Sequence, residues 1–549
     1  MGTAHRSNAK LQAKGSLASG AGSLQPDYLR LQPLCNAECP AGHDIRSWLA
    51  SAASGNYRQA WETMMANNPL PAVMGRVCYH ACEGACNRSK FDQAVNIHAI
   101  ERFVGDLAIR EGWRITPGPA SGKRVLVVGA GPAGLSAAYQ LARLGHAVTI
   151  AEAGPSVGGM MRFGIPSYRL PRVVLDAELA RIAATGVAIQ TNAPVSDVPA
   201  AMAKGGFDAC FLSIGAQVSK RATIATSVAD KVLDALSFLR AIATEAAPPR
   251  FGERVAVYGG GNTAIDVARS ALRLGAKDVR IIYRRTRARM PAHDFEIEEA
   301  LEEGVILHEL STIQSFDAGA LVIEAMTLDG RGWPQPTGRT RSLGIDTVIM
   351  ALGQDVDISL VNGLTGTHVS GERTVVVGED FQTGHPGVFA GGDMVPGERT
   401  VTVAVGHGRI AARAIDAWLR GEAYQPETSG ETASFDRLHL WYYDRIPATE
   451  QPVRPAAERR TSFEEITGGL DEDAARVEAA RCLSCGNCLE CDNCVVLCPY
   501  KAVTKRGAGE GFVIDRTACK VCGRCVVECP SGALQMTADT YAEKKCAIR

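Results

Sequence analysis

Hydrophobic positions between residues 123 and 152 change their period twice. A run of apolar, mostly β-branched residues at Val125–Val128 predicts a buried strand, and apolar residues then recur at helical spacing as far as Leu144. A second short apolar run, Ala147–Ala151, predicts another strand, which ends at Glu152. The order strand, helix, strand predicts a βαβ unit of an α/β domain.

The turn between the first of these strands and the helix is rich in glycine. In a dinucleotide-binding unit one glycine makes the tight turn, one admits a pyrophosphate against bare backbone, and one packs helix on strand. An acid about 20 residues further on accepts a hydrogen bond from a ribose hydroxyl. We therefore predict a dinucleotide site, with an ordinary glycine turn as the alternative, at Gly129, Gly131, Pro132, Ala133, Gly134 and Glu152.

The stretch Arg254–Ala264 repeats the order of strand, glycine turn and helix. Its second strand, Val279–Tyr283, ends in a run of arginines instead of an acid. An acid would repel a 2′-phosphate, whereas guanidinium groups bind one bidentately. The sequence therefore predicts an NADP(H) site, with a solvated basic loop as the alternative. Its residues are Gly259, Gly261, Asn262, Thr263, Ala264, Arg284 and Arg285.

Three further apolar runs, Ala209–Leu212, Thr347–Leu352 and Val388–Ala390, predict buried strands. The last run leads through Gly391 into Gly392-Asp393 and then into a predicted helix at about 400–419. In flavoproteins with two dinucleotide sites, a late Gly-Asp pair binds the ribityl chain of the flavin, and the next helix points its N-terminus at the pyrimidine end. The order of these motifs implies that the NADP domain is inserted into the FAD domain.

Length, composition and charge narrow the class of protein. With 549 residues, of which 46% are hydrophobic, the chain can form two to four domains. A net charge of −1 gives no overall positive electrostatic field that would attract nucleic acid or anionic lipid. No apolar run reaches the 18 residues of a membrane span. Residues 1–26 lack the apolar core of a signal peptide. We expect a disordered tail there and a soluble, cytoplasmic protein that binds neither nucleic acid nor membrane.

Cysteines are crowded into two parts of the chain. Of the seventeen, five lie in Cys35–Cys86 and ten in Cys482–Cys529. Spacings of two or three residues predict metal ligands before disulfides. The later block contains two copies of the bacterial ferredoxin run, in which the fourth cysteine ligates the other cluster. The predicted [4Fe-4S] sets are Cys488, Cys491, Cys494 and Cys529, and Cys519, Cys522, Cys525 and Cys498.

The N-terminal cysteine block has the spacing Cys35-x3-Cys39 and Cys78-x3-Cys82-x3-Cys86. Structural zinc sites favour Cys-x2-Cys knuckles or histidine partners, so zinc is the alternative here. We predict an iron–sulfur cluster in this block.

The motifs over about residues 34–419 resemble the small subunit of NADPH-dependent glutamate synthase and the matching part of dihydropyrimidine dehydrogenase. The matching motifs are Cys39-Pro40, Gly75-Arg76-Val77-Cys78, Cys82-Glu83-Gly84-Ala85-Cys86, GAGPAG, GGMMRFGIP, GGGNTA, YRR and AGGD. The resemblance implies FAD, NADP(H) and iron–sulfur clusters near the flavin. Carried over by position, one cluster has the ligands Cys39, Cys78, Cys82 and Cys86. The FAD residues are then extended by Gly159, Met160, Arg162, Gly164, Ile165, Gly392 and Asp393, although GGMMRFGIP alone could be a surface loop.

Two departures from that family bear on the number of clusters. The Cys78-x3-Cys82 spacing is shorter than is often found, and the Cys-x2-Cys pair that precedes Cys35 in the family is missing. A run of the same form, Arg481-Cys482-Leu483-Ser484-Cys485, lies near the other end of the chain. Family members complete this cluster with a non-thiolate side chain, which matches Glu101 by position. We therefore predict three or four clusters, the fourth held by Cys35, Glu101, Cys482 and Cys485; the alternative is that Cys482 and Cys485 are plain thiols in a linker.

The predicted fold is α/β, with two Rossmann-like domains flanked by an N-terminal helical iron–sulfur domain and a C-terminal α+β ferredoxin-like domain. The FAD domain is predicted at 120–250 and 345–425, and the NADP domain at 251–344. The remaining predicted segments are the tail at 1–26, the helical domain at 27–115, a linker at 426–480 and the ferredoxin domain at 481–549.

The predicted activity is electron transfer between NADP(H), FAD and [4Fe-4S] clusters, because a flavin links two-electron hydride to one-electron carriers. A disulfide reductase is excluded, since Cys210 is the only cysteine between Cys86 and Cys482. No stretch is left for a glutamine amidase or a reducing barrel, so we expect a reductase subunit that serves a ferredoxin or a larger subunit of glutamate-synthase-like or 2-oxoacid:ferredoxin oxidoreductase type. The alternatives are the small subunit of a glutamate-synthase-like complex and a redox-sensing or scaffold protein with inherited cofactors.

Overall fold

The computed structural model describes residues 24–538 apart from 221, 245–249, 318, 429 and 508–509. These residues form two compact units. The main unit consists of residues 34–429 and 445–482, and the terminal unit of the described residues within 1–33, 430–444 and 483–549. No helix in the described part of the chain has both the length and the apolar character needed to cross a bilayer.

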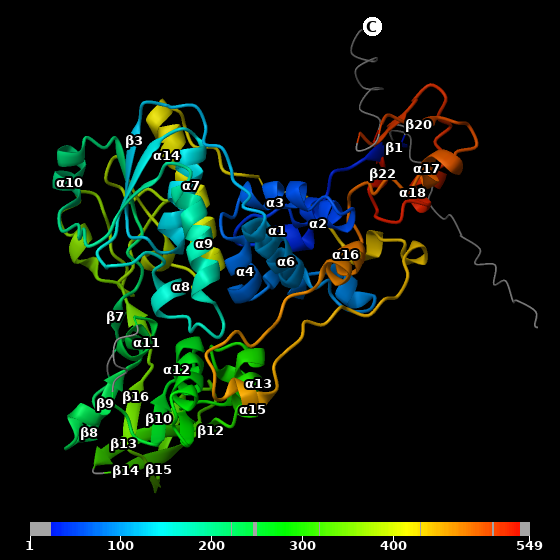
Figure 1. Cartoon of the computed structure of the whole chain (residues 1–549). Helices are drawn as coiled ribbons and strands as arrows, with labels where there is room; N and C mark the ends of the chain where they lie inside the picture. Colours follow the sequence, from blue (N-terminus) through cyan, green and yellow to red (C-terminus); the bar gives the residue numbers. More distant parts are fainter. Residues whose placement is uncertain are drawn as a thin grey trace, which may run out of the picture. The chain divides into compact units, whose positions relative to one another are not determined.

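The first βαβ unit of the sequence forms the centre of a five-stranded parallel sheet (Figure 1). Its strands, in spatial order, are β18 (Val388–Ala390), β6 (Ala209–Leu212), β3 (Arg124–Val128), β4 (Ala147–Ala151) and β5 (Ala188–Gln190). Two helices, α7 (Pro132–Arg143) and α14 (Val401–Arg420), pack against each other beside this sheet. The strands are almost entirely apolar because helices and loops cover both faces.

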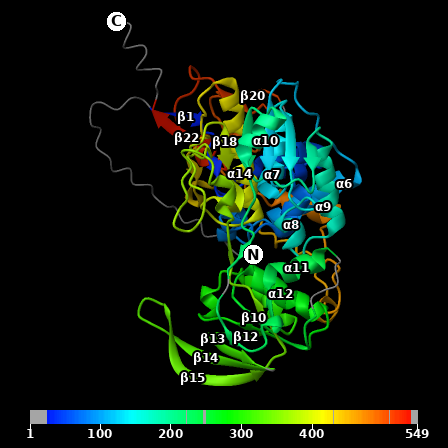
Figure 2. The same ribbon diagram turned by 90° about the vertical axis from the view of Figure 1, so that its left-hand side faces the viewer.

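The second nucleotide motif lies in a separate lobe of the main unit. Its parallel sheet has the order β12 (Ile306–His308), β11 (Asp278–Ile282), β10 (Arg254–Tyr258), β16 (Thr347–Met350) and β9 (Val232–Asp234). An antiparallel sheet of β13 (Ser311–Asp317), β14 (Ala320–Leu328) and β15 (Pro334–Gly344), with β8 (Ala225–Thr226) at its edge, completes the lobe (Figure 2). Strand β18 then rejoins the first sheet, which confirms the inserted arrangement.

The inserted lobe is larger than the predicted range 251–344. Strands β9 and β16 pair with each other, and helix α11 (Ala235–Ala243) packs against α12 (Asn262–Arg273), so all belong to the lobe. The chain enters and leaves through the antiparallel pair β7 (Val218–Ser219) and β17 (Gln354–Asp355). Strand β9 is too short to give a periodic signal, and the pattern of β16 could not indicate which of two parallel sheets it joins.

The N-terminal part of the main unit is helical. Its principal helices are α2 (Ile45–Ala53), α3 (Tyr57–Met65), α4 (Pro71–Val77) and α6 (Ile97–Arg110), with the short helices α1 (Leu34–Ala37) and α5 (Ala81–Gly84) beside the cysteines. Helices α4 and α6 cross in backbone contact, because a Cβ at Gly75 would lie 2.4 Å from the Arg102 nitrogen and one at Gly105 2.4 Å from the Ala72 nitrogen. Their buried residues share one apolar core with the first sheet.

The terminal unit joins both ends of the described chain. Strand β1 (Leu24–Tyr28) pairs antiparallel with β22 (Leu534–Ala538), and β20 (Val503–Lys505) pairs with β21 (Phe512–Ile514). Two short helices, α17 (Asn493–Val496) and α18 (Arg524–Val527), carry cysteines of the two runs. The predicted boundary at 26/27 therefore differs from the structure, since 24–33 belong to this unit; residues 1–23 lie outside the described residues.

The segment predicted as a linker at 426–480 is divided between the two units. Residues 430–444 belong to the terminal unit, and 445–482 to the main unit, where they include α15 (Ala456–Arg459) and α16 (Glu472–Ala480). Arg481 is fully buried and donates to the carbonyl oxygens of Ile446, Ala94 and Gln93. Hydrogen bonds from the buried Arg481 side chain tie residues 445–482 to the helical region, and the polar composition of the segment could not predict this.

Candidate functional site

Both glycine turns open into one cleft of about 1520 Å³ in the main unit. Most of the residues predicted for the two nucleotides line it. On the FAD side these are Gly129, Gly131, Pro132, Ala133, Glu152, Gly159, Met160, Gly164, Ile165, Gly392 and Asp393; on the NADP side they are Gly259, Gly261, Asn262, Thr263, Arg284 and Arg285. Gly134, Arg162 and Ala264 are not among the lining residues.

The first glycine turn leaves bare backbone at the start of α7. Gly131 is the N-cap residue, and a Cβ there would meet no neighbour within 4 Å. Gly159 has a φ of +51°, and a Cβ on it would lie 2.7 Å from the Gly131 Cα. Gly134 lies behind the turn, where a Cβ would be 2.0 Å from the Gly129 carbonyl oxygen. The turn thus offers N–H groups and space to a pyrophosphate, and the residues fit this part of FAD.

Glu152 lies at the end of β4 with its carboxylate against the glycine turn. Its two oxygens accept hydrogen bonds from the N–H groups of Ala130 and Gly154, both at 2.8 Å. This fixes the carboxylate on the wall of the cleft, where an acid of a βαβ unit meets a ribose.

Substitution of Glu152 tests its assignment to the FAD ribose. We expect Glu152→Ala to purify with less than one FAD per chain and with unchanged iron, because only the ribose contact and the anchoring of the turn are lost. Flavin absorbance and iron analysis measure the two quantities. A full complement of FAD in the variant would show that Glu152 is only a surface acid at a strand end.

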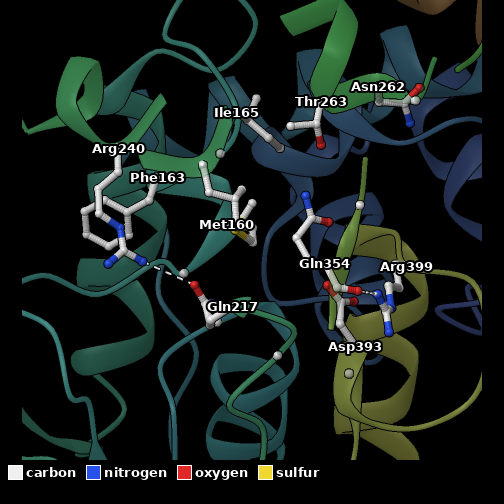
Figure 3. A pocket seen from close by; sticks show the side chains of 18 of the residues that line it. Met160, Phe163, Ile165, Gln217, Arg240, Asn262, Thr263, Gln354, Asp393 and Arg399 are labelled. Atoms are coloured by element: carbon white, nitrogen blue, oxygen red, sulfur yellow. Dashed lines mark hydrogen bonds between the residues drawn. The ribbon is translucent and has the colours of Figure 1, made fainter. Parts of the chain in front are cut away.

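Asp393 lies on the opposite wall, just before α14. Burial raises the pKa of Asp393 to about 6, although Arg399 opposes this rise. Arg399 itself donates to the carbonyl oxygen of Gln354 at 2.6 Å. Figure 3 shows Asp393, Arg399 and Gln354 together on one side of the cleft, with Met160 on the other. A half-buried carboxylate on the wall of the cleft is suited to accept hydrogen bonds from ribityl hydroxyls.

The NADP side repeats the bare turn at Gly261, the N-cap residue of α12. Arg284 and Arg285 follow β11 and line the cleft, Arg284 being exposed and Arg285 half-buried. The Arg285 guanidinium lies over the Trp333 ring at 5.2 Å, and its buried Nε has no partner among the described residues. Two cations at the end of the second strand fit a 2′-phosphate.

The helical region contributes a side chain that sequence reasoning missed. Tyr79 reaches the cleft, where its hydroxyl accepts a hydrogen bond from Asn262 Nδ2 at 2.7 Å and its ring stacks on His293 with centroids 3.6 Å apart. The backbone N–H of His293 donates to Asn262 Oδ1 at 3.2 Å. The NADP turn is therefore held by a residue that directly follows a predicted cluster ligand, Cys78.

The structure brings three of the predicted N-terminal ligands together. Burial raises the pKa of Cys39, Cys78 and Cys82, that of Cys78 to about 12, and the neighbouring thiols add to the rise at Cys82. Cys78 Sγ accepts from Thr402 Oγ1 at 3.1 Å and from the His80 N–H at 3.3 Å. Buried sulfur atoms that face hydrogen-bond donors suit the thiolate ligands of an iron–sulfur cluster. Cys86 packs against the same core.

Cys78 lies directly behind the wall of the cleft. The residues on either side of it in sequence, Val77 and Tyr79, both line the cleft. Thr402, which donates to its sulfur, is on the first turn of α14, and Val401 and Ala404 of the same turn also line the cleft. A cluster at Cys78 would therefore adjoin the flavin end of the nucleotide cleft.

Glu101 lies beside this first set of thiols. Burial raises its pKa to about 8, while Asn68 donates to its carboxylate at 3.0 Å. The sulfur atoms on which its charge acts are those of Cys39, Cys78 and Cys82. Cys35 and Cys482 pack against the core of the main unit, and Cys485 belongs to the terminal unit.

The fourth cluster stays a prediction that iron analysis can test. About sixteen irons per chain would support it, because each [4Fe-4S] cluster contributes four, whereas about twelve would contradict it. We expect Cys482→Ala to remove about four of the sixteen irons.

In the terminal unit the eight ferredoxin-run cysteines lie in two groups. Cys494 interacts electrostatically with Cys488, Cys491 and Cys529, so this group contains the fourth cysteine of the other run. Cys498, Cys519, Cys522 and Cys525 line one small cavity. The grouping has the exchanged fourth cysteine that two-cluster ferredoxins use.

The fold and the cleft define an FAD- and NADP-binding oxidoreductase with iron–sulfur domains at both ends. Residues 123–408 match the pyridine nucleotide-disulphide oxidoreductase family, and the chain belongs to it. Residues 30–113 match the 4Fe-4S cluster domain II of dihydropyrimidine dehydrogenase, and residues 487–533 match a 4Fe-4S dicluster domain. Cys210 is buried within β6 and is not among the residues that line the cleft.

Curated relatives share most of this chain. It is 38% identical over 502 residues to the NADP(+)-dependent formate dehydrogenase subunit beta of Moorella thermoacetica, covering 82% of this chain and 70% of that one. It is 34% identical over 505 residues to the NADPH-Fe(3+) oxidoreductase subunit beta of Geobacter sulfurreducens, covering 82% and 75%. It is 34% identical over 427 residues to the glutamate synthase [NADPH] small chain of Escherichia coli, covering 70% and 89%. The expected iron–sulfur flavoprotein that moves electrons between NADP(H), FAD and [4Fe-4S] clusters is thereby confirmed.

Proposed function

We propose that this chain is the reductase subunit of a larger oxidoreductase complex and passes electrons between NADPH and a partner subunit. The named relatives are subunits of formate dehydrogenase, of an Fe(3+) oxidoreductase and of glutamate synthase. Similar chains therefore occur in complexes that act on different substrates. The chemistry of the second substrate then belongs to the partner, and this chain supplies nucleotide binding and electron transfer.

The observation that carries this proposal is the position of Cys78 behind the shared cleft. The two glycine turns line one space, so dinucleotides bound at both turns would share it and the nicotinamide could approach the flavin. When bound, the flavin supplies the conversion between hydride and single electrons. Val77, Tyr79 and Thr402 then form the short layer of protein between that space and the Cys78 sulfur.

For the partner we propose a ferredoxin or a larger subunit of glutamate-synthase-like or 2-oxoacid:ferredoxin oxidoreductase type. The support is chemical, since each of these exchanges single electrons through iron–sulfur clusters. We propose the cytoplasm as the compartment, because many cysteine ligands at close spacing require reducing conditions to remain thiolates.

The test is anaerobic reduction of a viologen dye by NADPH with the purified full chain. We expect steady dye reduction and faster turnover with NADPH than with NADH. A protein that holds its cofactors but reduces no acceptor would instead be a sensor or scaffold. Pull-down of the native complex under anaerobic conditions, followed by identification of the bound subunit, tests the partner class separately.

A further inference from the structure

The first described strand of the chain completes the sheet of the terminal unit. Its register with β22 runs from Leu24 opposite Ala538 to Tyr28 opposite Leu534. The contact continues beyond the strand, because the Leu29 N–H donates to the Ala533 carbonyl oxygen at 2.9 Å. Residues about 500 positions apart are thus paired in one sheet, and β1 is a structural part of the cysteine-run unit.

Tyr28, the last residue of β1, contacts a predicted cluster ligand. Its ring stacks on Phe512 of β21, with centroids 6.4 Å apart and the planes at 16°. Its hydroxyl oxygen lies 3.1 Å from Cys494 Sγ. The ring stack and the strand pairing fix the hydroxyl from two sides, so the contact does not depend on an exposed, freely rotating side chain.

The direction of this hydrogen bond follows from the chemistry of the ligand. A cysteine that ligates iron is a thiolate and carries no proton to donate. A phenol, with an ordinary pKa of about 10, keeps its proton at neutral pH. Tyr28 must therefore donate to Cys494, and this bond is charge-assisted.

Backbone N–H groups donate to sulfur atoms of both sets, and in the first set these are the groups of Glu490 at Cys488 and of Asn493 at Cys491. In the other set the donors are as follows. Cys498 Sγ accepts from the Ala502 N–H at 3.3 Å, and Cys519 Sγ accepts from the Val521 N–H at 3.4 Å. Both donors are backbone groups, Val521 within the second run and Ala502 four residues after Cys498. The phenol of Tyr28 comes instead from the start of the chain and distinguishes the set that contains Cys494.

We propose that Tyr28 is a positioning residue that raises the reduction potential of the cluster held by Cys488, Cys491, Cys494 and Cys529. Reduction adds negative charge to a cluster and its thiolates, and hydrogen bonds to the sulfur atoms stabilise that charge. The donor therefore favours the reduced state of this cluster over that of its neighbour. A difference in potential between the two clusters gives electrons a preferred order of occupation in the terminal unit.

The test is an anaerobic redox titration of the full chain, followed by electron paramagnetic resonance, in the parent protein and Tyr28→Phe. The phenylalanine keeps the stack on Phe512 and removes only the donor. We expect a potential more negative by about 59 mV, which for a one-electron couple is a tenfold lower ratio of reduced to oxidised cluster at fixed potential. Iron content is expected to stay unchanged. Cys494→Ser and Cys525→Ser assign each signal to its cluster, since each alters one ligand set.

Tyr443→Phe is the matched control, because the Tyr443 hydroxyl donates to the Leu483 carbonyl oxygen at 2.7 Å in the same unit. We expect Tyr443→Phe to leave the reduction potentials of both clusters unchanged. In deuterated buffer, electron–nuclear double resonance should detect a coupling from the exchangeable phenol deuteron near the shifted cluster in the parent, and this coupling should be absent from Tyr28→Phe while those of the backbone amides at Cys488 and Cys491 remain. The proposal is overturned if Tyr28→Phe leaves both potentials unchanged, moves only the cluster of Cys525, or acts no differently from Tyr443→Phe.

Discussion

Replacing Arg284 and Arg285 together by alanine is expected to raise the KM for NADPH by roughly tens to thousands of fold and to leave NADH oxidation nearly unchanged. Each guanidinium can form a charge-assisted hydrogen bond worth about 1.5–3 kcal/mol, and every 1.4 kcal/mol is about tenfold in affinity. NADH has no 2′-phosphate, so it cannot lose this contribution. Steady-state dye reduction with the two nucleotides measures the ratio.

A neighbouring arginine provides the control for this substitution. Arg287 already pairs with Glu298 at 3.0 Å, so its charge is compensated within the protein. We expect Arg287→Ala to leave the preference for NADPH almost unchanged. If the double variant loses activity equally with NADPH and NADH, the two arginines form a solvated basic loop or support the fold, and the phosphate assignment is wrong.

The local motifs were predictable because each depends on residues close together in sequence. The run at Val125–Val128, the glycine turn and the following helix appear in the structure as β3, the cleft wall and α7. The lobe boundaries were wrong, since β9 has only three half-buried residues and its partner β16 lies more than a hundred positions away. Pairing between strands so far apart in sequence cannot be predicted from the hydrophobic pattern of either strand.

The same reason explains which parts of the site were missed. Tyr79 and Thr402 come from separate helical segments, and their roles arise only where these pack around the cleft. The Gly75-Arg76-Val77-Cys78 motif indicated a ligand but not that its neighbours line a nucleotide cleft. Residues 24–26 looked like the end of a polar tail, although they form β1 with a strand near the other end of the chain.

The position of Cys78 leads to the second prediction with a large effect. We expect Cys78→Ala to purify with about four irons fewer per chain and with its full FAD, because a cluster ligand is lost and the glycine turns are untouched. NADPH should still bleach the flavin absorbance, since both nucleotide sites remain. Viologen reduction should fall to the rate at which the dye takes electrons from the flavin directly.

Two further variants separate electron transfer from damage to the fold. Cys210→Ala removes a fully buried thiol from β6, where it pairs with Leu126 and Val388, and should keep iron, FAD and dye reduction. Thr402→Val removes only the 3.1 Å donor to Cys78 and should keep all the iron while making the potential of that cluster more negative. Full dye reduction in Cys78→Ala, with the four irons gone, would mean that electrons leave the cleft by another route. Retention of all the iron would mean that Cys78 is not a ligand.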